Sequence, residues 1–186
     1  MIFRDSGLIR LAFAAMAGAA VLCGQRYTDP DTLAPSFPTP QTVVDQMLLM
    51  AKIKPGEMVM DLGCGDGRIV IAAAQHYQAR AVGIEIRRDI YERTAARVAD
   101  MGLSDQVKII HGNALRADLT QADVVTLYLL TSSNERLKPI LEKQLKPSAR
   151  VVSHDFEIRG WKAAEVQKLM VAGRSHSVYL YTMSSR

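Results

Sequence analysis

Cysteine is scarce in this sequence, and charged residues of one sign form no long run. Two cysteines occur among 186 residues, and no metal-ligand spacing joins the cysteines to the four histidines. A disulfide framework is therefore excluded, and no metal site is predicted. The 23 lysines and arginines are scattered among 19 acidic residues, so the net charge of +4 does not favour a nucleic-acid partner. A chain of this length has room for one domain with a full hydrophobic core.

An apolar run long enough to span a membrane is also missing from the N-terminus. Residues 11–24 are apolar and small and follow Arg4 and Arg10, but they are fewer than the ~20 residues of a spanning helix. This pattern is typical of a signal peptide, and Ala-Gly-Ala at 17–19 offers a cleavage site. A membrane anchor and an organellar transit segment are the alternatives, so residues 1–27 predict export, membrane association or organellar import.

Prolines gather in residues 28–40, which predicts a linker, because proline cannot hold a regular hydrogen-bonded ladder. We expect Thr39 to cap a helix that begins at Pro40 and ends at the Lys-Pro-Gly of residues 54–56. The folded domain is expected to occupy residues 41–186.

Short apolar runs alternate with helical patterns over the rest of the chain. Helices are expected at 68–76 and from a cap at Asp89 to about residue 101. Too few residues follow the last parallel strand for another helical crossover, so an antiparallel hairpin turning at 172–173 is expected there. This order predicts an α/β fold with a doubly wound, Rossmann-like sheet, mostly parallel and ending in the hairpin. The expected strands are 57–62, 81–85, 107–111, 124–129, 150–154, 165–171 and 177–183.

The first strand runs into a loop of alternating glycines, Gly63, Gly65 and Gly67. The absence of Cβ atoms lets a ligand approach the backbone closely. A dinucleotide fingerprint would need its third glycine at position 68, where Arg68 stands, and the G-K-[ST] of a P-loop is absent. Glu85 ends the second strand, at the spacing where one carboxylate accepts both hydroxyls of a ribose. A solvated acid at a strand end is the alternative for Glu85.

With these features the chain resembles the class I S-adenosylmethionine-dependent methyltransferases over residues 38–183. More narrowly, Pro-Thr-Pro at 38–40, Leu-Tyr-Leu-Leu-Thr at 127–131 and Ser-His-Asp-Phe at 153–156 resemble the small protein-lysine methyltransferases. That group includes a broad-specificity archaeal enzyme and mitochondrial enzymes that act on the ATP synthase c subunit and the adenine nucleotide translocase. The resemblance implies an S-adenosylmethionine cofactor and a lysine side chain of a protein as the methyl acceptor.

Two positions depart from these relatives. They usually carry a tyrosine two residues before the Pro-Thr-Pro, where this chain has Ser36 and then Phe37, so the aromatic side chain is shifted by one residue. They also tend to have asparagine where Arg87 stands. The active-site lid and the adenosine rim are therefore expected to differ from theirs.

Residues at the strand ends make up the expected cofactor site. Asp61 is expected to contact the amino-acid end of the cofactor or to orient the glycine loop, and Asn113 with Ala114 to meet the adenine edge. Plainer alternatives exist. Asp61 would accept hydrogen bonds from the N–H groups of the loop, and Asn113 would belong to a simple turn. The expected cofactor-binding residues are Thr39, Asp61, Gly63, Gly65, Asp66, Gly67, Glu85, Asn113 and Ala114.

Methyl transfer from a sulfonium is a direct displacement, so the protein has to align the reactants and exclude water. Tyr128, at the carboxyl end of the fourth strand, is the first candidate for orienting the amine. His154 and Asp155, at the end of the fifth strand, are candidates for accepting its proton or holding the substrate. Trp161 is a candidate wall of the lysine channel. Packing or loop capping is the alternative role of all four residues.

Other acceptors and another class of function stay open on the sequence alone. The Asn/Asp-Pro-Pro-Tyr of adenine-methylating enzymes is absent after the fourth strand. RNA and small molecules are the alternative methyl acceptors, and a non-catalytic, membrane-tethered S-adenosylmethionine-binding protein is the alternative of another class. Export would separate the enzyme from a cofactor made in the cytosol. No sequence feature indicates an oligomeric state.

Overall fold

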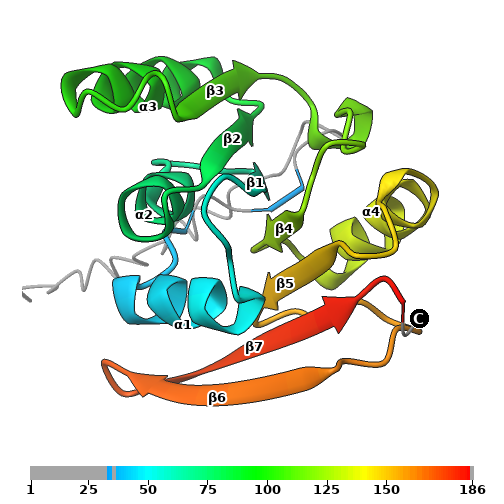
Figure 1. Ribbon diagram of the computed structural model, residues 1–186. Coiled ribbons are helices and arrows are strands. Elements are labelled where there is room, and N and C mark those ends of the chain that lie inside the picture. The colour runs from blue at the N-terminus through cyan, green and yellow to red at the C-terminus, as the bar shows by residue number, and fades with distance from the viewer. Residues whose placement is uncertain (1–32, 35–36, 185–186) are drawn as a thin grey trace, which may run out of the picture.

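A computed structural model describes residues 33–34 and 37–184 (Figure 1). A seven-stranded sheet with the order β3-β2-β1-β4-β5-β7-β6 runs through the middle of this part of the chain. The first five strands are parallel, and the last two form an antiparallel hairpin that joins the sheet through β7. The predicted α/β fold is confirmed. The strands are β1 (Met58–Leu62), β2 (Arg80–Glu85), β3 (Val107–His111), β4 (Val124–Leu127), β5 (Arg150–His154), β6 (Glu165–Val171) and β7 (Arg174–Thr182).

Helices cover both faces of the sheet (Figure 1). Because successive strand residues point to opposite faces, five of the strands contribute to two separate hydrophobic cores, namely β1, β2, β4, β5 and β7, whereas β3 and β6 contribute to one core only. One core lies under α1 (Gln41–Ala51), α2 (Arg68–Tyr77) and α3 (Arg88–Asp100), and the other under α4 (Thr131–Gln144) and the short 3-10 helix η1 (Ala114–Arg116).

Two helices begin differently from the prediction. Thr39 does not cap α1: the helix begins at Gln41, Pro40 takes the N-cap position, and the Thr39 hydroxyl bonds to His154 instead. Asp89 lies inside the first turn of α3 and pairs with two arginines of its own segment rather than capping the helix. In both cases another partner takes the oxygen that local capping would have used.

Four strands also have other bounds than expected, and β1 and β2 differ by only one residue at their start. β4 ends at Leu127, two residues early, so Tyr128 lies in the loop that follows. β7 begins at Arg174 rather than 177, because Ala172 and Gly173 both have positive φ and make a two-residue turn after which pairing starts at once.

The stretch expected to be a linker is tied to the domain where the structure describes it. Leu33 is buried in the core under α4, and its carbonyl accepts a hydrogen bond from the Ser133 hydroxyl. Thr39 is buried as well. The predicted signal, anchor or transit segment, residues 1–27, lies outside the described residues. Among the residues that are described, no helix is long and apolar enough to cross a bilayer.

Candidate active site

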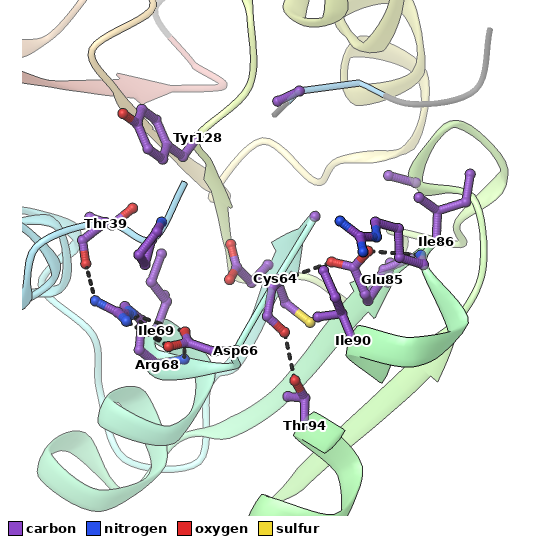
Figure 2. Close-up of a pocket in the computed structure, with 18 of the residues that line it drawn as sticks. Thr39, Cys64, Asp66, Arg68, Ile69, Glu85, Ile86, Ile90, Thr94 and Tyr128 are labelled. Atoms are coloured by element: carbon purple, nitrogen blue, oxygen red, sulfur yellow. Dashed lines mark hydrogen bonds and ion pairs between the residues drawn. The ribbon is translucent and has the colours of Figure 1, made fainter. Parts of the chain in front are cut away.

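A cavity of about 350 Å³ lies at the carboxyl ends of β1, β2 and β4, where the strand order reverses. This switch point is where open α/β sheets bind their ligands, and the volume suits a small molecule. The glycine loop, the first turns of α3 and the segment before α1 line it (Figure 2).

The glycine loop needs its glycines for two reasons. Gly63, Gly65 and Gly67 have φ values of 85°, 53° and 75°, in the left-handed region that other residues rarely adopt. At Gly67 a Cβ atom would also lie 2.7 Å from the Thr94 side chain of α3. The Thr94 hydroxyl donates to the carbonyl of Gly65 at 2.7 Å, so the loop is fastened to α3.

Gly83 in β2 is a residue that the sequence analysis missed. A Cβ atom at Gly83 would lie 2.6 Å from the Sγ of Cys64, which is buried in the glycine loop. Burial raises the pKa of the Cys64 thiol strongly, so Cys64 is a neutral packing residue and not a nucleophile. A glycine in the middle of an apolar strand was the available signal.

Glu85 points into the cavity with both carboxylate oxygens held. One oxygen accepts the N–H of Gly65 at 3.0 Å, and the other accepts the N–H of Arg87 at 2.8 Å. The side chain is 6% exposed and lines the cavity. Each oxygen keeps a lone pair, so the carboxylate can still accept two hydroxyl groups in a fixed orientation.

Asp61 lies at the end of β1, 3% exposed, and accepts a hydrogen bond from the Thr126 hydroxyl at 2.7 Å. Burial raises the pKa of its carboxyl to about 7; the Thr126 bond opposes this rise, and the nearby charges of Glu85 and Asp66 add to it. A cation placed beside Asp61 would favour the ionised carboxylate and so lower this raised pKa.

Arg68 was read from the sequence only as the position where a glycine is missing, but it lines the cavity. Its guanidinium bonds to Asp66 at 2.6 Å and donates to the carbonyl of Thr39 at 2.6 Å. The hydrogen bond from Arg68 lowers the pKa of Asp66, whose carboxylate thus holds this arginine in place. Arg68 ties the segment before α1 to the glycine loop (Figure 2).

Asn113 does not line the cavity, although its neighbours Gly112 and Ala114 do. Its side-chain oxygen accepts the N–H of Leu115 at 2.9 Å and caps η1. The turn role, which was the alternative, therefore describes Asn113, and the expected contact of its amide with adenine is not supported.

Three of the four candidate substrate residues do not line the cavity. Tyr128 lines the cavity, but His154 and Asp155 do not. His154 is completely buried behind Tyr128, with ring centroids 3.9 Å apart. Trp161 packs edge-on against Tyr181 and donates to Glu142, so it is a packing residue outside the cavity lining.

His154 contacts protein groups through both ring nitrogens. Nδ1 lies 3.2 Å from the Thr39 hydroxyl, and Nε2 lies 2.9 Å from Nδ1 of His176 in β7. The same His176 nitrogen lies 3.1 Å from Asp155 Oδ2. Burial lowers the pKa of His154, so its ring is neutral near pH 7. His176 was missed, because nothing in the sequence links positions 22 residues apart on antiparallel strands.

The glycine loop follows the carboxyl end of β1 and lies opposite Glu85, an acid that can accept the two hydroxyls of a ribose. This arrangement defines an S-adenosylmethionine-dependent methyltransferase. Residues 61–165 match the family model of the ANTKMT methyltransferase domain, and the chain belongs to this family. The resemblance found in the sequence is thereby confirmed.

Named relatives agree on methyl transfer but differ in acceptor. A protein-lysine N-methyltransferase of Saccharolobus islandicus is 47% identical over 150 residues, 80% of this chain and 93% of that protein. The adenine nucleotide translocase lysine N-methyltransferase of Mus musculus is 32% identical over 66% of this chain and 53% of its own length. A crystal structure described as an RNA methyltransferase from Salinibacter ruber, in complex with S-adenosyl-L-homocysteine, is 42% identical, with a TM-score of 0.74 over 81% of this chain and 95% of that one.

Proposed function

We propose that this protein transfers the methyl group of S-adenosylmethionine to a lysine side chain of a protein. The relative described as a protein-lysine N-methyltransferase, 47% identical over most of both chains, carries this proposal. The aromatic border of the cavity supports it: Phe37, 68% exposed, and the half-buried Tyr128 both line the cavity. Aromatic surface of this kind suits the long aliphatic stem of lysine.

The proposal includes roles for the cavity residues. The two oxygens of Glu85 accept the ribose hydroxyls, and Asp61 faces the ammonium group at the methionine end of the cofactor. Thr39 and Arg68 lie at the end of the cavity opposite Glu85 (Figure 2), where they suit the carboxylate of the methionine end. Ala114 presents apolar surface to the adenine.

The residues around the acceptor have to make a lysine nucleophilic. When bound, the cofactor supplies a methyl group on a cationic sulfonium, and the acceptor amine takes this methyl group by displacing the sulfur directly. Holding a lysine neutral at pH 7 costs about 4–5 kcal/mol from its ordinary pKa of about 10.4. The aromatic walls offset part of this cost, because they exclude water from the ammonium form. Burial raises the pKa of Tyr128, so its hydroxyl stays protonated and orients the amine without acting as a base.

A labelled lysate tests the acceptor class. The purified full chain is incubated with a lysate and S-adenosylmethionine that carries a tritiated methyl group, and the product is divided between protease and ribonuclease. We expect protease, and not ribonuclease, to release the label. Tyr128→Phe should lower kcat about 10-fold or more through loss of an orienting hydrogen bond, while Tyr77→Phe at the end of α2 serves as the matched control.

RNA is the second candidate acceptor, since the Salinibacter ruber relative is described as an RNA methyltransferase. Arg87, Arg93 and Arg97 line the cavity edge and could face phosphates. However, Arg87 and Arg93 pair with Asp89, and Arg97 pairs with Asp66, which reduces the free positive charge there. Label released by ribonuclease alone would favour this candidate.

A further inference from the structure

Three side chains, two at the end of β5 and one in β7, bring one ligand atom each into mutual contact. His154 Nε2 and His176 Nδ1 lie 2.9 Å apart. Asp155 Oδ2 lies 3.2 Å from the first nitrogen and 3.1 Å from the second, so the three atoms form a closed triangle of nearly equal sides. Residue spacing predicted no metal site, because only the antiparallel pairing of β5 with β7 brings His176 to the other two residues.

Hydrogen bonds alone leave one side of this triangle unsatisfied. The Asp155 carboxylate has no proton, and each imidazole nitrogen holds either one proton or one lone pair. If both histidine nitrogens carry a proton, two N–H groups meet along the 2.9 Å side. If either nitrogen lacks its proton, its lone pair faces a lone pair of the carboxylate. This mismatch exists for every tautomer of the two rings.

A metal cation would satisfy all three atoms at once, because each atom can present a lone pair to it. Two ligands about 2.1 Å from an ion lie about 3.0 Å apart at the right angle of an octahedral site and about 3.4 Å apart at the tetrahedral angle. The observed sides of 2.9, 3.1 and 3.2 Å are close to this range. The three side chains would therefore need little movement to bind an ion.

The outer contacts of these side chains also match those of metal ligands. Metal-bound histidines usually form a hydrogen bond through their other ring nitrogen, and metal-bound carboxylates accept a further hydrogen bond. His154 Nδ1 lies 3.2 Å from the Thr39 hydroxyl, and Asp155 Oδ1 accepts the N–H of Ser177 at 2.8 Å. The His154 side chain is completely buried, whereas that of Asp155 is 25% exposed and offers the side from which an ion can enter.

We propose that His154, His176 and Asp155 bind a divalent transition-metal ion, with water completing its coordination. Two imidazoles and one carboxylate suit zinc, and the same ligands on one face of an octahedron suit iron(II). His154 contacts Thr39 and Tyr128, which line the cavity, whereas the three ligands do not line it. The ion therefore fixes the cavity wall from behind and takes no part in methyl transfer. This inference depends neither on the methyl acceptor nor on the cofactor placement proposed above.

Zinc titration of the full chain, treated with a chelator and dialysed free of it, tests the site. Calorimetry should show one zinc ion bound per chain. Loss of an outer hydrogen bond lowers metal affinity about 10- to 100-fold, so loss of a ligand should lower it further. We expect Asp155→Asn and His176→Asn each to raise the Kd for zinc at least about 100-fold, and Thr39→Val to raise it about 10-fold.

Matched controls separate this site from zinc bound at surface side chains. His76→Asn in α2 and Asp100→Asn at the end of α3 change exposed residues of the same two types, and both should bind zinc as the wild type does. At a zinc concentration about 100 times Kd, the wild-type Tm should rise by about 5–10 °C. The Tm of Asp155→Asn should not rise, and its unfolding without zinc checks that the variant folds.

Two further measurements distinguish the candidate ions. Iron(II) is titrated without oxygen in the same way, and the chain purified without a chelator is analysed for its elements. Zinc or iron at about one ion per chain, lost in His176→Asn, would support the proposal and identify the ion.

The decisive comparison is between the wild type and the ligand variants. A wild-type chain that binds zinc and iron(II) no more tightly than Asp155→Asn and His176→Asn would overturn the inference, because any ion would then lie elsewhere. A folded His176→Asn that keeps the full zinc-dependent rise in Tm would overturn it as well. Failure to methylate lysine would refute the proposed function alone.

Discussion

Replacing Asp61 by asparagine should stabilise the free protein while weakening cofactor binding. The Asp61 pKa, raised by burial from its usual 3.8 to about 7, corresponds to about 4 kcal/mol against the ionised form in the fold. Asparagine carries no charge and can still accept the Thr126 hydroxyl. We expect Asp61→Asn to raise the free energy of unfolding by about 2–4 kcal/mol at pH 8, since part of the gain is lost to burying the amide.

The sign of the effect fixes its pH dependence. Because the folded pKa lies above the unfolded one, the protonated Asp61 adds stability that is fully present below about pH 3.8 and lost as pH rises through about 7. The advantage of Asp61→Asn over the wild type should therefore shrink to less than half by pH 5 and disappear below pH 4. Urea unfolding at pH 8 and pH 5 measures both values, with the exposed Asp100→Asn as control.

Cofactor binding should change in the opposite direction. An ammonium group beside Asp61 requires the ionised carboxyl, whose fraction falls about eightfold from pH 7.5 to pH 6 at a pKa of about 7. The ligand's own α-amino group, with a pKa near 7.7–8.0, becomes more protonated over the same range and offsets part of this loss, so wild-type Kd should rise about fivefold. Asp61→Asn should bind more weakly and lose this dependence. A less stable Asp61→Asn at pH 8, or an advantage that does not shrink by pH 5, would refute the reasoning.

Three further predictions concern the glycine loop, Glu85 and the N-terminus. Gly67→Ala should lower the free energy of unfolding by about 1–3 kcal/mol more than Gly56→Ala does. Both glycines have positive φ, but only at Gly67 would a Cβ atom lie against Thr94. Equal losses in urea unfolding would argue against the clash. Glu85→Gln should weaken S-adenosylmethionine binding at least about 100-fold in calorimetry. An amide NH₂, which donates, would replace one of the two oxygens that accept a backbone N–H. A Kd within threefold of the wild type would show that Glu85 does not belong to the ribose site. Cleavage of residues 1–27 as a signal or transit segment predicts a shortened N-terminus when the native protein is sequenced, whereas an intact Met1 would favour a retained anchor.

The local pattern of the sequence predicts much of the fold. The strands 107–111, 150–154 and 165–171 have the predicted bounds, because an apolar run covered on both faces, or a hairpin turn, is encoded by neighbouring residues. The glycine loop and Glu85 could be placed together for the same reason: each ends a parallel strand, and these ends meet at one edge of the sheet.

What the sequence did not predict depends on partners far along the chain. The Thr39 hydroxyl bonds to His154, which is 115 residues away, so a local capping rule could not foresee it. His176 joins His154 only because β7 pairs with β5 in antiparallel register. Asn113 illustrates the reverse case. Its side-chain oxygen accepts a hydrogen bond from Leu115, two residues away, although its position after a strand predicted a contact with the ligand.

The most direct test of lysine methylation is the chemical identity of the methylated residue. Protein labelled in a lysate by the wild type and S-adenosylmethionine with a tritiated methyl group is hydrolysed in acid, and its amino acids are separated beside methyl-lysine standards. The label should elute with ε-N-methyl-lysine, and Glu85→Gln should give none. Label recovered only in nucleosides, or with another methylated amino acid, would contradict the proposed function.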